Sequence, residues 1–147
     1  MTITEQKAAQ RKAGIAARRA LSDTERTRSN AALCARIMAL DCFKKAENIL
    51  LYAAFGGEAD LSALAVEAAR QGKTLAYPVC GEGFSLTAAV PGPDGWEVGL
   101  YGIRTPILSR SEVLRPVQLD LVLVPCTAFD TACRRVGMGK GLSLIHI

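Results

Sequence analysis

A strand, a helix and a second strand follow one another in the middle of the chain, and this order constrains the fold more than any other feature. The apolar run at 48–54 predicts the first strand. Asp60 is a good N-terminal cap for a helix, and Gly72 stands where glycine commonly ends one. A second apolar run at 74–78 predicts the returning strand. Because strands joined through a helix are normally parallel with a right-handed crossover, the sequence predicts an α/β sheet.

Two helices are expected ahead of this unit. Thr2 with Glu5, and Ser22 with Glu25, have the spacing of a capping box. The predicted helices are 2–21 and 22–40. The cations among the first 28 residues are Lys7, Arg11, Lys12, Arg18, Arg19, Arg26 and Arg28. They outnumber the carboxylates there, which suggests an anionic ligand near the N-terminus, although a solvated helix face carries the same charges.

The remaining segments are expected to extend the sheet. The length of the chain predicts a single domain. We expect a third strand at 84–90, a loop rich in glycine and proline at 91–102, and a buried parallel strand at 119–124. The expected architecture is an open, mostly parallel, Rossmann-like three-layer sheet with an N-terminal basic helix. Ligands of such sheets bind beyond the carboxyl ends of the strands, where the loops 55–59 and 125–141 lie.

The last six residues, Leu-Ser-Leu-Ile-His-Ile, are suspect as native sequence. They are what CTG-TCT-CTT-ATA-CAC-ATC encodes, and that string is the transposon end used in sequencing-library preparation. We expect 142–147 to be a non-native tail without function, the alternative being a genuine short terminal strand. His146 is the only histidine of the chain. Residues 1–141 therefore contain no histidine that could take part in a nucleophile pair or a metal site.

A glycine-rich loop with cations lies just ahead of this tail. Its residues are Arg135, Val136, Gly137, Met138, Gly139, Lys140 and Gly141. Glycines let backbone N–H groups approach phosphate oxygens, and arginine and lysine neutralise the phosphate charge. A Walker A loop would need glycine where Arg134 stands, so this is not a standard P-loop. On these residues alone, an ordinary flexible turn is the stronger alternative.

The order of segments around this loop resembles a known enzyme family. An apolar strand and proline at 119–125 lead to Phe-Asp at 129–130 and then to Arg-Val-Gly-Met-Gly-Lys-Gly at 135–141. This run resembles the signature of 5-formyltetrahydrofolate cyclo-ligases, which continues with Tyr-Tyr-Asp. Further segments that resemble the family, in the same order, are the N-terminal basic helix, 52–58, 72–78 and 102–106. Because Leu-Ser-Leu at 142–144 replaces Tyr-Tyr-Asp and its magnesium-binding aspartate, we expect 1–141 to form an incomplete cyclo-ligase-like domain.

The resemblance implies an ATP-dependent folate enzyme. In the family's reaction the γ-phosphoryl group of ATP activates the formyl oxygen of 5-formyltetrahydrofolate, and ring closure with loss of phosphate gives 5,10-methenyltetrahydrofolate. ATP and Mg²⁺ are the expected cofactors, and such phosphoryl transfer relies on cationic clamps rather than on a protein nucleophile. The implied ATP-binding residues are Lys7, Arg11, Arg135, Val136, Gly137, Met138, Gly139, Lys140 and Gly141, with Arg135 and Lys140 as catalytic cations.

Three further residues are assigned to the folate site by the same resemblance. Glu58 is expected to hold the pterin or a donor on the formyl side, Ala53 to line the pocket, and Tyr101 to stack on the pterin. The alternatives are a solvated loop glutamate and an ordinary loop tyrosine. No protein ligand for the metal is expected within 1–141. Asp130 is interpreted as a turn residue rather than as an anchor behind the site.

Other function classes stay open or are disfavoured. A same-fold paralogue with another substrate, or a non-catalytic nucleotide-binding module, would fit the same loop and helix. Nucleic-acid binding is disfavoured because the cations lack interleaved aromatic residues, and a membrane location because no run of about 18 apolar residues exists. Five cysteines without close pairs favour a reducing compartment. We expect a cytoplasmic monomer, and we expect the truncated chain itself to be inactive.

Overall fold

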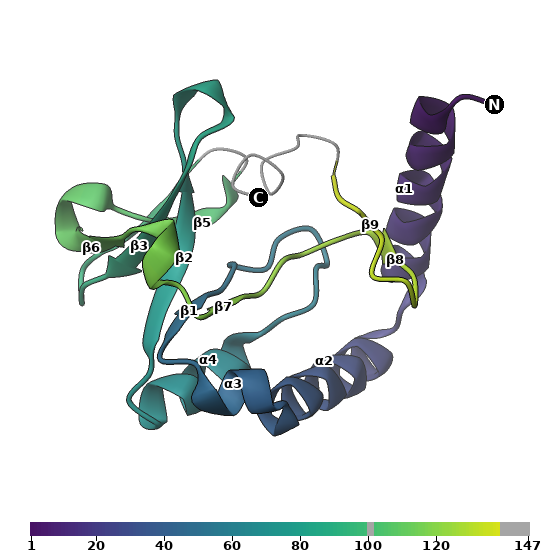
Figure 1. Ribbon diagram of the computed structural model, residues 1–147. Coiled ribbons are helices and arrows are strands. Elements are labelled where there is room, and N and C mark those ends of the chain that lie inside the picture. Colours follow the sequence, from purple (N-terminus) through teal and green to yellow (C-terminus); the bar gives the residue numbers. More distant parts are fainter. Residues whose placement is uncertain (100–101, 139–147) are drawn as a thin grey trace.

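A mixed β-sheet with helices on one side organises the protein (Figure 1). The computed structural model describes residues 1–99 and 102–138. Its helices are α1 (Ile3–Ala20), α2 (Asp23–Ala39), α3 (Asp41–Lys45) and α4 (Ser62–Arg70). Its strands are β1 (Asn48–Leu50), β2 (Thr74–Cys80), β3 (Leu86–Pro91), β4 (Trp96–Val98), β5 (Arg104–Pro106), β6 (Ser111–Leu114), β7 (Leu121–Val122), β8 (Ala128–Phe129) and β9 (Arg135–Val136). Within these residues no helix combines the length and apolar character that crossing a membrane requires.

The main sheet has five strands in the order β6-β3-β2-β1-β7. β1 is parallel to both β2 and β7, with Ile49 opposite Leu75 on one side and Leu121 on the other. The predicted strand–helix–strand unit is therefore confirmed as β1, α4 and β2, and the α/β class with it. The sheet is mixed because the third predicted strand returns antiparallel as β3, and β6 pairs antiparallel with β3. The Rossmann-like topology stays a prediction.

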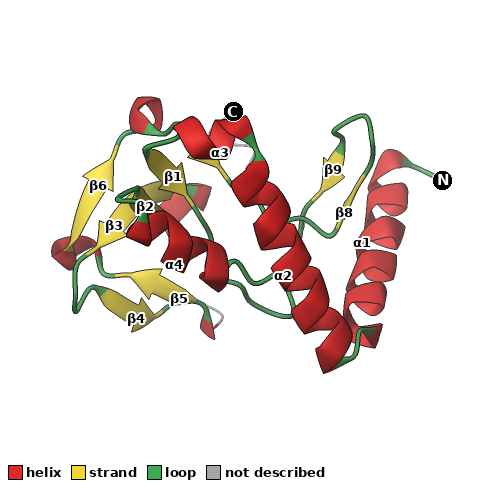
Figure 2. Ribbon diagram, turned by 90° about the horizontal axis from the view of Figure 1, so that it is seen from below, coloured by secondary structure: helices red, strands yellow, loops and turns green. Residues whose placement is uncertain are grey.

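Helices α2, α3 and α4 gather on one face of this sheet (Figure 2). Phe43 of α3, Leu64 of α4 and Ile49 of β1 are at most 1 % exposed, and Cys34 of α2 belongs to the same cluster. Burying each large apolar side chain contributes roughly 1.5–3 kcal/mol. α1 packs on the β8–β9 hairpin instead of the sheet. In the described part of the chain there is thus one helical layer, and the second layer of the three-layer prediction is not seen.

The two predicted capping boxes are present. The hydroxyl of Thr2 accepts the backbone N–H of Glu5 while the Glu5 carboxylate accepts that of Thr2, and Ser22 and Glu25 repeat the pattern. The accepted backbone hydrogen bonds are the main reason that the pKa values of both glutamates lie below their usual range. α1 and α2 therefore begin where the sequence predicts, and each ends one residue before its predicted end.

Helix α4 ends where the sequence predicts and begins one residue later than expected, with Leu61 rather than Asp60 as its N-cap residue. Gly72 adopts a left-handed conformation, with φ of +77°. Its N–H donates to the carbonyl of Ala69 at 2.9 Å, and the N–H of Lys73 donates to that of Ala68 at 3.0 Å, which is a Schellman motif. At the other end the carboxylate of Asp60 accepts the N–H of the first helical residue at 2.9 Å. Local sequence chemistry thus fixes both ends of the crossover helix.

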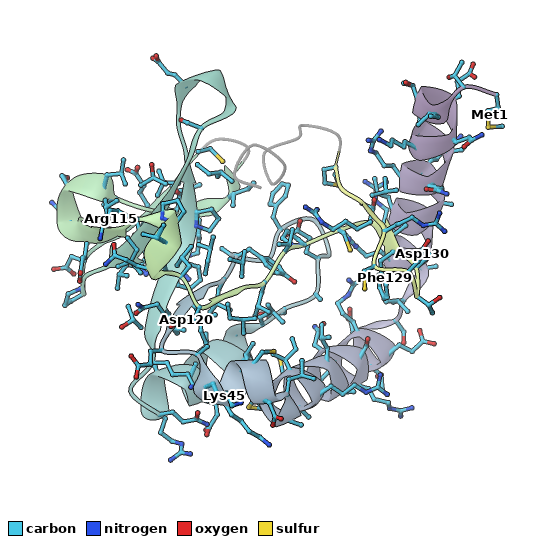
Figure 3. All side chains as sticks on the ribbon, viewed as in Figure 1. Met1, Lys45, Arg115, Asp120, Phe129 and Asp130 are labelled. Atoms are coloured by element: carbon cyan, nitrogen blue, oxygen red, sulfur yellow. The ribbon has the colours of Figure 1, made fainter. Side chains whose placement is uncertain are left out.

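Asp120 interrupts the apolar run at 119–124 for a structural reason. Its carboxylate accepts the backbone N–H groups of Glu47 at 3.0 Å and Asn48 at 2.9 Å, which start β1. Figure 3 shows Asp120 at the beginning of β7, beside β1. The regular strand covers only two residues, and Val122 is 47 % exposed, so the predicted strand is present and parallel but shorter and less buried than expected.

The predicted loop at 91–102 is wrong in part, because it contains β4. β4 pairs antiparallel with β5, and the resulting hairpin lies on β2. The ring centroids of Trp96 and Tyr77 are 4.7 Å apart, and the guanidinium carbon of Arg104 lies 4.6 Å from the Trp96 ring. Three-residue strands flanked by glycine and proline show no periodicity that would have predicted them. The short strand β6 was not predicted either.

Candidate active site

The candidate site lies where the neighbouring strands β1 and β7 end. Because these strands are parallel and paired, the chain leaves both of them at the same edge of the sheet. The segments 57–59 and 124–129 line a cavity of about 490 Å³ there, together with side chains from α1 and α2. We call it the strand-edge cavity. The structure thus brings together parts of the two loops in which a site was expected.

Helix α1 is joined to the segment that follows β7 along a single helical face. The Nε–H of Arg11 donates to the carbonyl of Gly137 at 2.8 Å, and Nη2 of Arg18 donates to the carbonyl of Cys126 at 2.9 Å. Between them, a Cβ on Gly14 would lie 2.2 Å from the carbonyl oxygen of Thr127. Spacings of three and four residues put these positions on one face. α1 therefore holds the start of the glycine-rich loop in place.

The β8–β9 hairpin between these contacts is closed by side-chain hydrogen bonds (Figure 3). The carboxylate of Asp130 accepts the backbone N–H groups of Ala132 and Arg134 at 3.0 Å each, and Nε of Arg134 donates to it at 2.7 Å. These bonds, led by the backbone N–H of Arg134, hold the pKa of Asp130 below its usual range. The interpretation of Asp130 as a turn residue is confirmed.

The expected phosphate-binding residues are placed in part. Lys7 is exposed on α1, one turn before Arg11, and makes no hydrogen bond or salt bridge within the described ranges. Arg135 and Val136 are half-buried in β9, Gly137 follows them, and Met138 is exposed. Gly139, Lys140, Gly141 and Tyr101 lie outside the described residues. The structure therefore brings Arg11 to the first half of the loop, and the phosphate-binding roles of all these residues stay predictions.

Glu58 is half-buried at the strand-edge cavity. It follows Gly56 and Gly57, whose φ angles of +60° and +81° turn the chain sharply after β1. Burial raises the pKa of Glu58, while the N–H of Phe55, which donates to Oε2 at 3.0 Å, and the positive charge of Arg18 act in the opposite direction. The carboxylate is therefore partly desolvated and partly compensated, as in a site that accepts hydrogen bonds from a ligand. Ala53, also half-buried, lies between β1 and this turn.

Two side chains hold the Glu58 loop through hydrogen bonds to its backbone carbonyls. The hydroxyl of Tyr52 donates to the carbonyl of Ala59 at 2.9 Å, and burial, followed by the charge of Glu58, raises the pKa of Tyr52 to about 12. Nη1 of Arg26 donates to the carbonyl of Gly57 at 3.3 Å, while its Nη2 donates to that of Arg18 at 3.0 Å. α1, α2 and the loop are thereby fastened to one another.

Reasoning from the sequence missed several of these residues. Only Gly14 carried a usable signal, because a glycine inside a helix costs about 1 kcal/mol relative to alanine and often marks close backbone approach. Tyr52 and Arg26 gave no such signal, since a tyrosine after a strand and an arginine in a helix are ordinary.

Comparison with known proteins decides the family. The family model of 5-formyltetrahydrofolate cyclo-ligases matches residues 3–143. The chain belongs to this family. A member from Haemophilus influenzae, a 5-formyltetrahydrofolate cyclo-ligase, is 32% identical over 101 residues, which cover 67% of this chain and 54% of that protein. The chain thus spans about half the length of this curated relative.

Two solved structures share the fold of this chain. The 5,10-methenyltetrahydrofolate synthetase of Aquifex aeolicus is 33% identical, with a TM-score of 0.82 over 95% of this chain and 71% of that one. The synthetase of Mycoplasma pneumoniae has a TM-score of 0.72 at 20% identity, over 92% of this chain and 73% of that one, and shows the shared fold alone. The resemblance found in the sequence is therefore confirmed at the level of the family and the mixed α/β fold.

Proposed function

We propose that the protein to which these residues belong converts 5-formyltetrahydrofolate to 5,10-methenyltetrahydrofolate in an ATP-dependent reaction that releases ADP and phosphate. Family membership and the names of the relatives support this assignment. In the reaction the formyl oxygen bonds to the γ-phosphorus as the bond to ADP breaks. The neighbouring folate nitrogen then bonds to the formyl carbon and loses its proton to solvent, and phosphate leaves with that oxygen. The enzyme is accordingly a ligase that forms a C–N bond.

The observation that carries the proposal is the hydrogen bond from Arg11 to the carbonyl of Gly137. It joins the basic face of α1 to the glycine-rich loop, so that Lys7 on the same face lies one helical turn away. Cations that converge on a loop able to offer backbone N–H groups form a phosphate clamp. On this proposal Lys140 and Arg135 neutralise the charge that develops during phosphoryl transfer.

The folate side of the proposed site is the turn after β1. Glu58 offers a half-buried carboxylate, and a pterin has amino and ring N–H donors that a carboxylate accepts well. Ala53 would line the pocket and Tyr101 would stack on the pterin. A carboxylate is better suited to this side than to the phosphates, which it would repel.

Mg²⁺ is expected as the partner of ATP in this proposal. Within residues 1–99 and 102–138 no group of three or more histidine, cysteine, aspartate or glutamate side chains could hold a metal ion. Mg²⁺ in such enzymes is commonly bound by phosphates, water and one or two carboxylates. No step of the proposal is therefore assigned to a metal ligand of this chain.

The test is an assay of the protein expressed from its intact genomic reading frame. The absorbance of 5,10-methenyltetrahydrofolate is followed while 5-formyltetrahydrofolate and ATP are varied independently. Product formation that requires both compounds, with one ADP per product, is the expected result. Nucleotide binding without turnover would indicate a binding module, and binding of ATP without binding of 5-formyltetrahydrofolate would indicate a paralogue with another substrate.

A further inference from the structure

Arg18 contacts each of the segments that surround Glu58. Its Nη2 donates to the carbonyl of Cys126 at 2.9 Å, which fixes the chain where it leaves β7. Its own carbonyl accepts Nη2 of Arg26 at 3.0 Å. A Cβ on Gly57 would lie 3.2 Å from its Cδ, so the aliphatic part of the side chain lies against the turn that carries Glu58. One half-buried arginine thus connects α1, the exit of β7 and the turn after β1.

The surroundings of Glu58 contain few other charges. Arg26 from α2 uses both terminal nitrogens on backbone carbonyls. Tyr52 is neutral at physiological pH, and burial raises its pKa further, to about 12. Cys126 contributes its carbonyl to Arg18. The positive charge that lowers the pKa of Glu58 is that of Arg18, and it does so without a direct salt bridge between the two side chains.

We propose that Arg18 is a positioning residue, which holds the turn after β1 against α1 and thereby orients the Glu58 carboxylate at the strand-edge cavity. Its positive charge also opposes the effect of burial on that carboxylate. The inference deepens the proposed function and rests on it in one respect, namely that Glu58 accepts hydrogen bonds from the folate. Arg18 itself need not touch either substrate. Its guanidinium already donates to the Cys126 carbonyl, which fixes its place at the exit of β7.

The decisive comparison is Arg18→Gln with Arg19→Gln. Arg19 is the exposed neighbour on α1, so both variants lose the same charge from the same helix. With Arg18→Gln, we expect Glu58 to titrate at higher pH in carbon-detected NMR of labelled glutamate, with the signal assigned through Glu58→Gln. The acid limb of 5-formyltetrahydrofolate binding should move to higher pH as well, because a carboxylate with a higher pKa is protonated sooner as the pH falls. Arg19→Gln should leave both curves in place.

Kinetics separate positioning from general damage. Loss of an oriented carboxylate should raise the KM for 5-formyltetrahydrofolate about tenfold in Arg18→Gln, with the KM for ATP changed less than about twofold. Arg18→Lys retains the charge, so Glu58 should titrate at nearly the same pH in this variant as in the wild-type protein. If Arg18→Gln does not fold, the wild-type protein offers the same test, since about 1 M salt screens a through-space charge and should move the Glu58 titration upward.

Several results would overturn the inference. They are a Glu58 titration that is the same in Arg18→Gln and the wild-type protein, an Arg18→Lys variant that titrates like Arg18→Gln, or equal increases of both KM values. The NMR titration needs no substrate, so it judges Arg18 even if the protein does not bind folate. Absent folate binding with an intact Arg18 effect would refute the proposed function alone.

Discussion

Glu58 experiences opposing influences at the carboxyl end of β1. Burial favours its protonated form, while the N–H of Phe55 and the charge of Arg18 favour the ionised form. A carboxylate in this balance is a strong acceptor because water does not fully solvate it. Its environment is therefore better suited to a ligand with N–H donors than to an anion.

Glu58→Gln should raise the KM for 5-formyltetrahydrofolate and leave that for ATP nearly unchanged. Glutamine keeps the shape but replaces an ionised acceptor, and such a loss in a partly buried site costs on the order of 1–3 kcal/mol. The measurement is the rate of methenyl product formation with each substrate varied in turn. Unaltered folate kinetics, or a defect restricted to ATP, would remove Glu58 from the folate pocket.

Replacing Lys7 and Arg11 by alanine should affect stability differently, although both residues are expected to contact ATP. Lys7 has no partner within the described residues, so Lys7→Ala should weaken ATP binding and leave the free energy of unfolding unchanged. Arg11→Ala also removes the bond to Gly137 and should lower stability by about 0.5–1.5 kcal/mol in addition. Calorimetric titration with ATP and urea denaturation measure the two effects. ATP affinity unchanged in Lys7→Ala would separate the basic face of α1 from the phosphates.

Among individual residues, the sequence could predict those whose role follows from the strand or helix in which they stand. Glu58 follows a strand, and Lys7 and Arg11 are one helical turn apart. Arg18 could not be assigned in the same way, because its partner Cys126 is 108 positions away and the bond depends on how α1 is placed. Single-sequence reasoning does not provide that placement.

At the scale of elements, α1 depends on the hairpin beside it. The helix buries no residue completely, so its own apolar face does little to hold it. Its attachment consists instead of the Arg11 and Arg18 hydrogen bonds and the close approach at Gly14. The capping box predicted where this helix starts, but no local signal predicted what it would pack against.

Gly14→Ala should destabilise the protein, against the usual effect of alanine in a helix. Alanine would gain about 1 kcal/mol from helix propensity, yet its Cβ would lie 2.2 Å from the Thr127 carbonyl oxygen and push α1 away from the hairpin. We expect a net loss of about 1–3 kcal/mol in urea denaturation, as is typical of overpacking.

Gly137→Ala is the matched control for this change. The same added methyl group meets nothing within 4 Å at Gly137, so stability should be unaffected there. A Gly14→Ala protein as stable as the wild type would mean that α1 is not closely packed on Thr127.

Elements with strong periodicity or caps were predictable, and short ones were not. α4 was expected from Asp60 and Gly72. Gly72 ends the helix as predicted, whereas the N-cap is Leu61 and Asp60 bonds to Ser62 from one position earlier. The β4–β5 hairpin depends on Trp96 meeting Tyr77 and Arg104, which are 19 and 8 positions away along the chain. The antiparallel return of β3 is also a tertiary choice, since an apolar run does not encode its direction.

For the whole molecule, carboxylates with lowered pKa values set the response to acid. Asp120 accepts backbone N–H groups at the start of β1, and hydrogen bonds from Arg70 lower the pKa of Glu67 to about 2. A group whose pKa is lower in the folded state stabilises it above the unfolded pKa, and this is lost as the pH falls through the folded pKa. Glu58 acts in the opposite sense, because its raised pKa favours folding below the unfolded pKa and the contribution is lost as the pH rises.

The melting temperature should therefore fall as the pH decreases from about 5 to about 2, since the lowered groups outnumber Glu58. Circular dichroism melts across this range measure the effect. Asp120→Asn, which cannot ionise, should show a shallower decrease than the wild-type protein. A melting temperature that rises on acidification would show that the balance lies with Glu58 instead.

The β4–β5 hairpin also provides an optical reporter for one end of the molecule. Trp96 is the only tryptophan of the chain, and its ring contacts both Tyr77 and Arg104. Its fluorescence will follow the order of β2 and the hairpin, whereas far-UV circular dichroism is dominated by helices such as α1, which lies away from the hairpin (Figure 2). Coincident unfolding curves from the two signals would indicate a single cooperative unit. Helical signal lost while the emission is unchanged would mean that α1 can melt from an intact sheet, together with Lys7 and Arg11, which are proposed to bind the phosphates.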